Sequence, residues 1–359
     1  MTSTAVTPSR LQTLDRARDQ GLKVLAALPY HYPRALIRAH GFHPMEVWAP
    51  PGGADAGAVH FQAYACSIVT RGAAFLMTGG FDAVDAVLVP HGCDALQGLG
   101  SVLRDFVTDR PPVLTLYAPR TRRPVDLDYL VAEYRRLGES LVAAGGREPS
   151  PQDWAVAFAA EDAADQSLRD LFAERATLAL TDRDFYAVVR AREYLLAEDF
   201  VALVDGVPRG QAPRPGLPIV LSGIMADPPD LLDVVNEAGA YIATDDLSTG
   251  TRRILPATGD TDPWQRLAHA YLDGPVDPTR ADPIAQRVQR LRELVAGSGA
   301  RGVLAIAPPF CEPEQFYLPA LRKGLGVPLL YVEHEGGGEV DGQLVGRIEA
   351  FVETLEVAR

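Results

Sequence analysis

Residues 84–97, VDAVLVPHGCDALQ, contain the clearest strand-to-helix pattern of the chain. Its apolar run at 86–89 has the length and composition of a buried β-strand, and a proline and a glycine then end that run. Cys93 follows, and after it a helical segment for which Asp94 is a candidate N-cap. A cysteine therefore lies where a strand ends and a helix begins, which is where open α/β sheets bind their ligands.

The two other cysteines of the chain occupy similar positions. Cys311 follows an apolar strand at 303–307 and a Pro-Pro break, and Cys66 precedes another helix-like segment. Backbone amides at the start of a helix favour an anionic sulfur. This shared placement indicates a common role for the three thiols.

Soft thiolates suit zinc, copper(I) or an iron–sulfur cluster. The sequence has no CxxC pair of the kind that structural zinc sites use, and its three cysteines are too few for a ferredoxin cluster with four. Three thiolates would leave one iron of a four-iron cubane open. The alternative is that all three cysteines are small buried hydrophobic residues.

Length, charge and composition restrict the class of protein. A chain of 359 residues suggests two domains, and a net charge of −13 argues against nucleic acid or an anionic membrane as a partner. No run of 18 apolar residues predicts a membrane-spanning helix, and the N-terminus lacks the apolar core of a secretory signal. An odd, low number of cysteines fits a reducing cytoplasm, where we expect the protein.

The order of strand-like and helix-like segments predicts an α/β fold with two doubly wound, Rossmann-like (flavodoxin-like) domains, parallel sheets and a helical layer between them. We expect an N-terminal α/β domain at 1–124, a helical connecting segment at 125–215 and a C-terminal α/β domain at 216–359. Strands are predicted at 22–28, 45–48, 86–89 and 113–117 in the first domain. In the second domain, Asp227 is predicted to cap a helix.

Several other side chains are candidates for the site. Tyr30, His31 and Tyr32 lie in the first strand-to-helix turn, at the edge of the sheet where a substrate binds. His91 flanks Cys93 and is a candidate catalytic or cluster-tuning group. The alternatives are a packed aromatic turn for the first group and a purely structural histidine for the second.

The acidic candidates have weaker signals. Asp245 and Asp246 end a strand and are candidates to face the cleft, but adjacent acids in a turn are expected to be solvated. Glu312 is expected to cap a helix, and the alternative is a proton carrier. A metal site at residues 333–335, the sequence EHE, is disfavoured because the glycines that follow predict a loop.

The chain resembles the 2-hydroxyacyl-CoA dehydratase and benzoyl-CoA reductase family over roughly residues 24–355. The matching stretches are YHYPRALIRAHGFHP, ACS with Cys66, FDAVDAVLVPHGCDALQ with Cys93, AGAYIATDDLSTGTR, VLAIAPPFCEP with Cys311, and VPLLYVEHEGGGEVDGQLVGRIEAFVE. In that family, three cysteines at the matching places bind a 4Fe–4S cluster with one open iron. The resemblance therefore implies that Cys66, Cys93 and Cys311 are the cluster ligands.

The resemblance also implies partners and a reaction. It implies a paralogous iron–sulfur subunit in a heterodimer, an ATP-hydrolysing activator that delivers one electron at very low potential, and an acyl-CoA substrate. In the dehydratases the electron converts the thioester of a 2-hydroxyacyl-CoA into a ketyl radical anion that expels the hydroxyl group, whereas the reductases dearomatise benzoyl-CoA. Arg34, Arg38 and Arg71 are candidates for the CoA phosphates by position alone. The alternative is an electron-relay or divergent subunit that uses the open iron for other reductive or sulfur chemistry on a non-CoA substrate.

Overall fold

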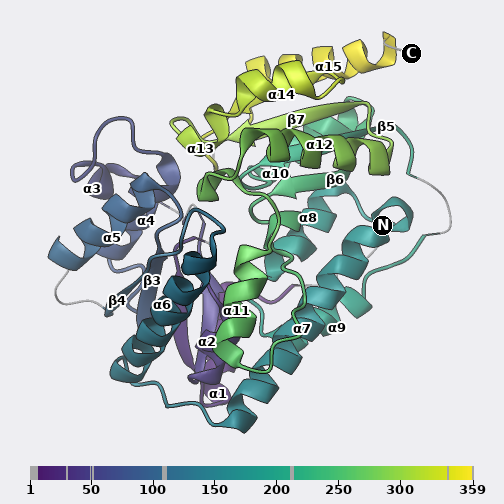
Figure 1. Cartoon of the computed structure of the whole chain (residues 1–359). Coiled ribbons are helices and arrows are strands. Elements are labelled where there is room, and N and C mark those ends of the chain that lie inside the picture. The colour runs from purple at the N-terminus through teal and green to yellow at the C-terminus, as the bar shows by residue number, and fades with distance from the viewer. Residues whose placement is uncertain are drawn as a thin grey trace.

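The computed structural model describes residues 7–29, 31–48, 50, 52–106, 111–210, 214–337 and 339–357. Within these ranges the chain forms two four-stranded sheets in which every pair of neighbouring strands is parallel (Figure 1). The first sheet has the order β2-β1-β3-β4 and consists of β1 (Lys23–Ala27), β2 (Phe42–Glu46), β3 (Ala86–Pro90) and β4 (Val113–Leu116). The second has the order β6-β5-β7-β8 and consists of β5 (Leu217–Gly223), β6 (Ala240–Leu247), β7 (Gly302–Ala307) and β8 (Leu329–Glu333).

Both sheets have the same topology. In each, the second strand lies on one side of the first and the third strand lies on the other, so that the connections reverse direction between the first and third strands. Ligands of open α/β sheets bind outside the carboxyl ends of the strands at such a reversal. Cys93 follows β3 and Cys311 follows β7, one at each reversal. The predicted fold class, with two doubly wound parallel sheets, is confirmed.

Helices cover both faces of each sheet. They are α1 (Arg10–Asp19), α2 (Arg34–Ala39), α3 (Asp55–Ala58), α4 (Ser67–Met77), α5 (Asp94–Phe106), α6 (Pro124–Ala143), α7 (Pro151–Ala173), α8 (Asp182–Ala191), α9 (Ala197–Asp205), α10 (Pro229–Glu237), α11 (Pro263–Leu272), α12 (Ile284–Ser298), α13 (Glu312–Gln315), α14 (Leu318–Gly324) and α15 (Gly342–Val357), with short 3-10 turns at Arg175–Thr177, Thr251–Arg253 and Pro278–Arg280.

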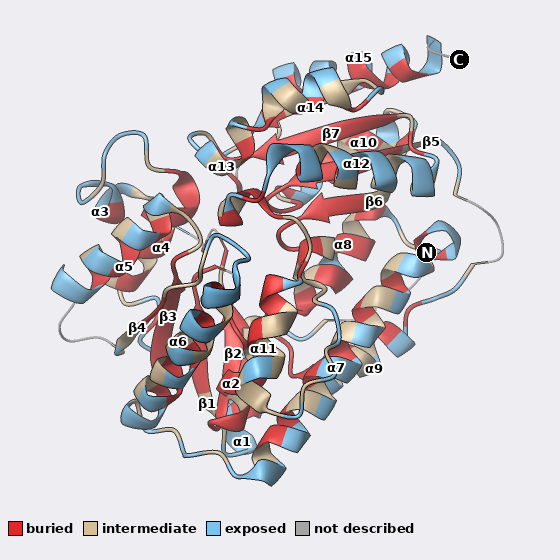
Figure 2. Cartoon of the chain, viewed as in Figure 1, coloured by how far each residue is buried: buried red, intermediate tan, exposed pale blue. Residues whose placement is uncertain are grey.

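The central strands β1, β3, β5 and β7 are mostly buried (Figure 2), because alternate residues of each strand face different helices. On β1, Leu25 packs with α2, α6 and α11, whereas Ala26 packs with α4 and α5. On β5, Leu221 packs with α8, α10 and α15, whereas Val220 packs with α12 and α14. This double burial explains why the strands appear in the sequence as continuous apolar runs.

The helices between the two sheets belong to both cores. On α7, Trp154 and Ala157 pack in the core of the first sheet, whereas Leu168 and Leu171 pack in the core of the second. Helix α11 follows β6 in the sequence, yet it packs against α6 in the core of the first sheet. The division at residues 124 and 215 stays a prediction.

Two local predictions are wrong. The second strand was expected at 45–48, but β2 spans Phe42–Glu46. It includes Pro44, which an edge strand tolerates because the missing amide need not hydrogen-bond to a neighbouring strand. Asp227 does not cap α10: Pro228 holds the cap position. The Asp227 carboxylate instead accepts a hydrogen bond of 2.8 Å from the amide of Gly337 and pairs with Arg190.

None of the helices in the described parts of the chain is long and apolar enough to cross a membrane.

Candidate functional site

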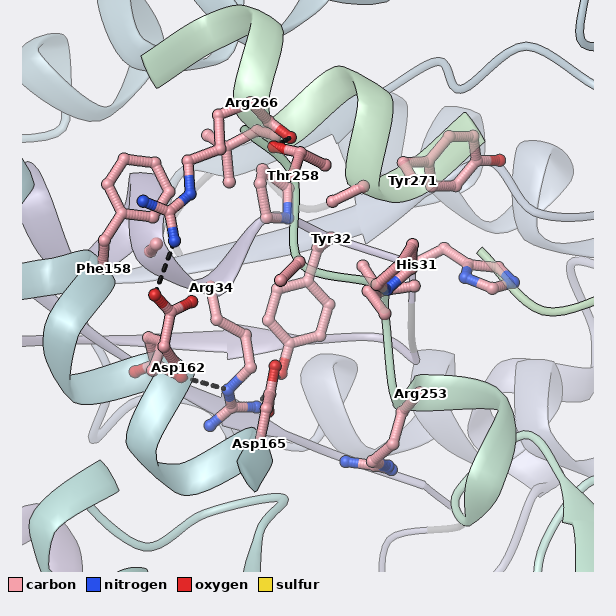
Figure 3. A pocket seen from close by; sticks show the side chains of 18 of the residues that line it. His31, Tyr32, Arg34, Phe158, Asp162, Asp165, Arg253, Thr258, Arg266 and Tyr271 are labelled. Carbon is pink, nitrogen blue, oxygen red and sulfur yellow. Dashed lines mark hydrogen bonds and ion pairs between the residues drawn. The ribbon is translucent and has the colours of Figure 1, made fainter. Parts of the chain in front are cut away.

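Two cavities lie against one another at the carboxyl ends of the strands. The smaller, of about 40 Å³, is lined by all three cysteines of the chain together with mainly apolar groups, among them Trp48, Val69, Leu96 and Ile224. The larger, of about 130 Å³, is lined by charged and aromatic side chains and is shown in Figure 3. His31 lines both cavities.

Both sheets supply the cysteine cavity from their points of reversal. His31 follows β1 and Cys93 follows β3 in the first sheet, while Ile224 follows β5 and Cys311 follows β7 in the second. Cys66 comes from the long connection between β2 and β3. The predicted convergence of the three cysteines is therefore what the structure shows, and it requires both halves of the chain.

Each cysteine is held at the beginning of a helix. Cys66 is the N-cap residue of α4, where its carbonyl accepts the amides of Val69 (3.1 Å) and Thr70 (3.2 Å). Cys311 is the N-cap residue of α13, and Cys93 directly precedes α5. These turns aim backbone amide dipoles at the thiols, an arrangement that stabilises negative charge on sulfur.

Burial has the opposite effect on the thiols. Burial, with a smaller contribution from the neighbouring thiol of Cys93, raises the pKa of Cys66 to about 11. Burial also raises the pKa of Cys311, with additional contributions from Glu314 and the two other cysteines. Burial is also the main cause that raises the pKa of Cys93. A cationic group bound in the cavity would favour the thiolate forms of all three.

The donor set at this cavity is rich in sulfur. The three cysteines line it together, and His31 is the one other common metal ligand among the described residues that line it. Among the described residues, no three His, Cys, Asp or Glu side chains are placed to hold a single metal ion. Three soft thiolates are the type of ligand that an iron–sulfur cluster uses, so the chemistry of the residues present fits such a group.

His31 forms the wall between the two cavities. Its backbone has a positive φ of 68°, which is uncommon for a residue with a side chain. The ring meets Tyr271 edge to face at 5.6 Å, and Nε2 lies 3.6 Å from a carboxylate oxygen of Asp277. Burial, together with the guanidinium groups of Arg280 and Arg252, holds the pKa of His31 well below its usual value, so the imidazole is neutral at neutral pH. Tyr30 lies outside the described residues.

A buried carboxylate, Glu46 at the end of β2, anchors the first wall of the larger cavity. It accepts hydrogen bonds from the Arg253 fork at 2.9 and 3.3 Å, from the hydroxyl of Tyr32 at 3.0 Å and from the indole of Trp48 at 2.5 Å. Burial raises the pKa of Tyr32 far above its usual value, so its hydroxyl stays protonated as a donor. Because Arg253 comes from the second half of the chain, this contact joins the two halves beside the cavity.

A second group of charges adjoins the first, because Arg34 donates to the hydroxyl of Tyr32 at 2.6 Å. Glu161 of α7 pairs with Arg34 (3.2 Å) and Arg192 (2.6 Å), and Asp162 pairs with Arg266 (Figure 3). Burial alone would raise the pKa of Glu161, but the two guanidinium groups outweigh it and lower the pKa to about 2. The carboxylate therefore stays ionised at every physiological pH.

A third, fully buried network lies behind Cys311. Glu314, one turn further along, donates its amide to the carbonyl of Cys311 (3.0 Å) and accepts hydrogen bonds from Arg252 (2.8 Å) and Arg287 (3.3 Å). Asp246 pairs with the same two arginines. The expectation that Asp245 and Asp246 are solvated is wrong, because both are fully buried.

The remaining sequence candidates lie outside both cavities, except for Arg34. His91 packs against Tyr117 (4.0 Å between ring centroids), and neither of its ring nitrogens has a hydrogen-bond partner among the described residues. Arg71 donates to the carbonyl of Gly336, and Arg38 pairs with Glu198. Asp94 and Glu312 are the first residues of α5 and α13 rather than caps, and Glu333–Glu335 lie at the end of β8 and in the loop after it. The catalytic roles of Tyr30, His31 and His91 stay predictions.

Sequence reasoning missed the charged residues of the larger cavity. Glu46, Glu161 and Arg253 stand in the sequence without a motif. One sequence signal could have pointed to Arg253: it directly follows the stretch AGAYIATDDLSTGTR, which matches the family and ends at Arg252.

Two parallel α/β sheets whose carboxyl ends meet at a cavity lined by three thiols define a doubly wound α/β protein with a cysteine site between its two sheets. A family model described as "2-hydroxyglutaryl-CoA dehydratase, D-component" matches residues 29–355, and the chain belongs to this family.

Similar proteins extend over nearly the whole chain. The (R)-2-hydroxyglutaryl-CoA dehydratase beta subunit of Acidaminococcus fermentans is 26% identical, and the match covers 98% of this chain and 97% of that protein. The (R)-phenyllactyl-CoA dehydratase beta subunit of Clostridium sporogenes is 23% identical, with 93% and 92% covered. A benzoyl-CoA reductase subunit of Thauera aromatica is 24% identical, with 84% and 82% covered. Among solved structures, the laminin-binding protein Lbp of Streptococcus pyogenes is 10% identical, and the match covers 93% of this chain and 98% of that one. Its TM-score of 0.22 is too low for the comparison to inform the function.

Proposed function

We propose that this chain is the iron–sulfur subunit of a radical-type 2-hydroxyacyl-CoA dehydratase or of the related aromatic acyl-CoA reductase. The observation that carries the proposal is the convergence of Cys66, Cys93 and Cys311 on one cavity that shares His31 with a second, larger cavity. The family to which the chain belongs and the names of its relatives support the same class of enzyme.

The three cysteines would hold a 4Fe–4S cluster, each through one thiolate, with one iron free of a protein thiolate. Such a group supplies single electrons and a Lewis-acidic iron for a substrate oxygen. The chain itself provides the thiolates, the amide dipoles at three helix starts and a cavity whose described lining includes no Asp, Glu, Lys or Arg. An apolar surrounding of this kind limits access of water to the reduced state.

The larger cavity would take the acyl part of a CoA thioester. His31 forms its boundary with the cysteine cavity, so the reacting end of the acyl group would lie beside this neutral imidazole. Tyr32 and Tyr271 supply the adjoining walls and keep water from that end. The imidazole can hydrogen-bond the acyl end without adding a charge near the thiolates.

The proposal includes partners. Each of these relatives is named as one subunit of a larger enzyme, so this chain would work with a second, paralogous iron–sulfur subunit. An ATP-hydrolysing activator would supply the electron, and the substrate would be an acyl-CoA. The three cysteines are free thiols, which fits a reducing, cytoplasmic location.

The test is the content of iron and acid-labile sulfide in protein purified without oxygen. We expect about four of each per chain, because the proposed cluster contains four irons and four sulfides. Cys311→Ser should lose most of both, and Ser101→Ala, on the exposed side of α5, should lose neither. Near-zero iron after anaerobic reconstitution of the unchanged protein would show that the cysteines are structural, and the proposed function would fail.

A further inference from the structure

Helix α13 separates the cysteine cavity from solvent by a single turn. Its N-cap residue Cys311 and its second residue Pro313 line the cavity. Phe310, directly before Cys311, is 51% exposed, and Phe316, directly after the helix, is 70% exposed. Of the described phenylalanines three are more than half exposed, and two of these flank this turn. Exposed aromatic side chains that gather at one place mark an interaction surface.

The backbone of the turn fixes both phenylalanines relative to Cys311. Phe310 has a φ of 62°, in the left-handed region, where a bulky side chain is an outlier. Such conformations are costly and gather at functional sites. The carbonyl of Phe310 accepts the amide of Glu312 at 3.0 Å, and the carbonyl of Glu312 accepts the amide of Phe316 at 3.0 Å. The two rings are therefore held at the surface directly beside one of the three cysteines.

Carboxylates adjoin the two phenylalanines. Glu312 is exposed on α13. The side-chain amide of Gln315 donates to the carboxylate of Glu333 at 2.8 Å, which brings the end of β8 against α13. Glu333 and Glu335 are both exposed. The apolar centre at α13 therefore has an acidic edge.

The same surface reaches a second cysteine. The carbonyl of Glu335 accepts a hydrogen bond of 2.8 Å from the hydroxyl of Ser67, which directly follows Cys66. The carbonyl of Gly336 accepts one of 2.8 Å from Arg71, on the same helix α4. Helix α13, the loop after β8 and the start of α4 are therefore continuous beside two of the three cysteines (Figure 1).

We name this area the α13 surface. It consists of Phe310, Glu312, Phe316, Glu333, Glu335 and Arg71. These groups give it a net charge of about −2 at neutral pH.

We propose that the α13 surface docks a redox protein that presents a basic face around an apolar centre, and that the electron passes between this partner and the group held by the cysteines through the α13 turn. The inference rests on the proposed function and adds the place and the charge of the partner. Electron transfer between proteins weakens steeply with distance, so a partner docks where the redox group lies closest to the surface. Complementary charge steers such an encounter, and an apolar centre holds it.

The charge of the chain argues against a second copy as the occupant. Each copy would present the same acidic edge, and the chain as a whole has a net charge of −13. Like charges that face each other oppose association. A partner with the opposite charge fits the same surface.

The test measures electron transfer from the full chain, purified without oxygen and holding the expected iron. The chain is reduced with dithionite, desalted and mixed with ferric cytochrome c, a basic protein, in a stopped-flow instrument. One electron leaves the reduced cluster and converts ferric haem to ferrous haem. The matched probe is cytochrome c with succinylated lysines, which has the same haem and an acidic surface. The basic form should react at least about tenfold faster at low salt, and the ratio should fall towards one at high salt.

Variants locate the effect on the chain. Glu312→Gln combined with Glu335→Gln should slow the reaction with basic cytochrome c by about 2- to 30-fold at low salt, the effect of two exposed ion pairs. The control, Glu353→Gln combined with Glu356→Gln, removes the same charge near Leu355 of α15, whose carbonyl accepts Arg301 just before β7, at the other end of the sheet. It should change the rate little. Phe316→Ser should slow the reaction at low and at high salt, and all variants should retain the iron.

The other outcomes each overturn the inference. Equal rates for the two forms of cytochrome c, or equal slowing by the two double variants, would show that the α13 surface does not select the partner. A dimer of the unchanged chain in sedimentation that becomes a monomer in Phe316→Ser would assign the surface to a second copy. These results leave the proposed function standing, whereas a chain without iron would end the proposed function and this inference together.

Discussion

Replacing Glu314 by alanine should destabilise the protein by about 3–5 kcal/mol. The Glu314 carboxylate is 5% exposed and accepts hydrogen bonds from Arg252 at 2.8 Å and Arg287 at 3.3 Å, both of which are fully buried. The alanine variant leaves two buried guanidinium groups with Asp246 and Asp277 as their remaining carboxylates. Removing one partner of a buried ion pair typically costs this much, because the remaining charge has lost its solvation and its partner.

The free energy of unfolding, from urea titrations followed by circular dichroism, measures this cost. The control is Glu174→Gln, which breaks the pair with Arg209, where both side chains are about 40% exposed. Exposed pairs contribute about 0.2–1 kcal/mol, so the two variants should differ by at least about 2 kcal/mol. Glu314 also supports the turn of Cys311, so its variant should retain less iron at equal amounts of folded protein. A loss for Glu314→Ala no larger than that for Glu174→Gln would refute this view of the network.

Two further predictions concern acid and packing. Glu161 has a folded-state pKa of about 2, below the value of 4.5 for a free glutamate, so its contribution to stability is complete above pH 4.5 and is lost as the pH falls towards 2. This amounts to about 3 kcal/mol, and urea titrations at several pH values should show a shallower acid dependence for Glu161→Gln. Gly223→Ala should destabilise by about 3 kcal/mol or more, because the added Cβ would lie 1.7 Å from the carbonyl oxygen of Ile306 on the neighbouring strand. As a control, Gly297→Ala, whose added Cβ would meet nothing within 4 Å, should be neutral or stabilising. Thermal melts measure both variants, and equal melting temperatures would contradict the packing argument.

The parts of this fold that the sequence predicts are those with local signals. The apolar run before Cys93 and the proline and glycine after it indicate a strand and its end, and β3 occupies Ala86–Pro90. The same pattern before Cys311, an apolar run followed by two prolines, predicts β7 and the turn after it. Because all strands are parallel, their carboxyl ends meet at the same edge, and the cysteines converge as expected.

The charged residues of the site have no such local signal. Glu46 and Arg253 are 207 residues apart in the chain, and their contact exists only because the two sheets face each other. Asp246 was expected to be solvated because adjacent acids in a turn usually are. Its partners, Arg252, Arg287 and Arg290, are brought to it by a turn and by α12. Burial of a charge depends on such distant partners, and one sequence does not show them.

The relative orientation of the two halves decides whether the site is complete. The cysteine cavity takes Cys66 and Cys93 from the first half and Cys311 from the second, so neither half alone has all three thiols. The halves are joined near this cavity by Arg253 on Glu46 and by the hydroxyl of Ser67, which donates to the carbonyl of Glu335 at 2.8 Å. A group bound by all three thiolates would therefore stabilise the closed arrangement by linkage, since it binds only when both halves are in place.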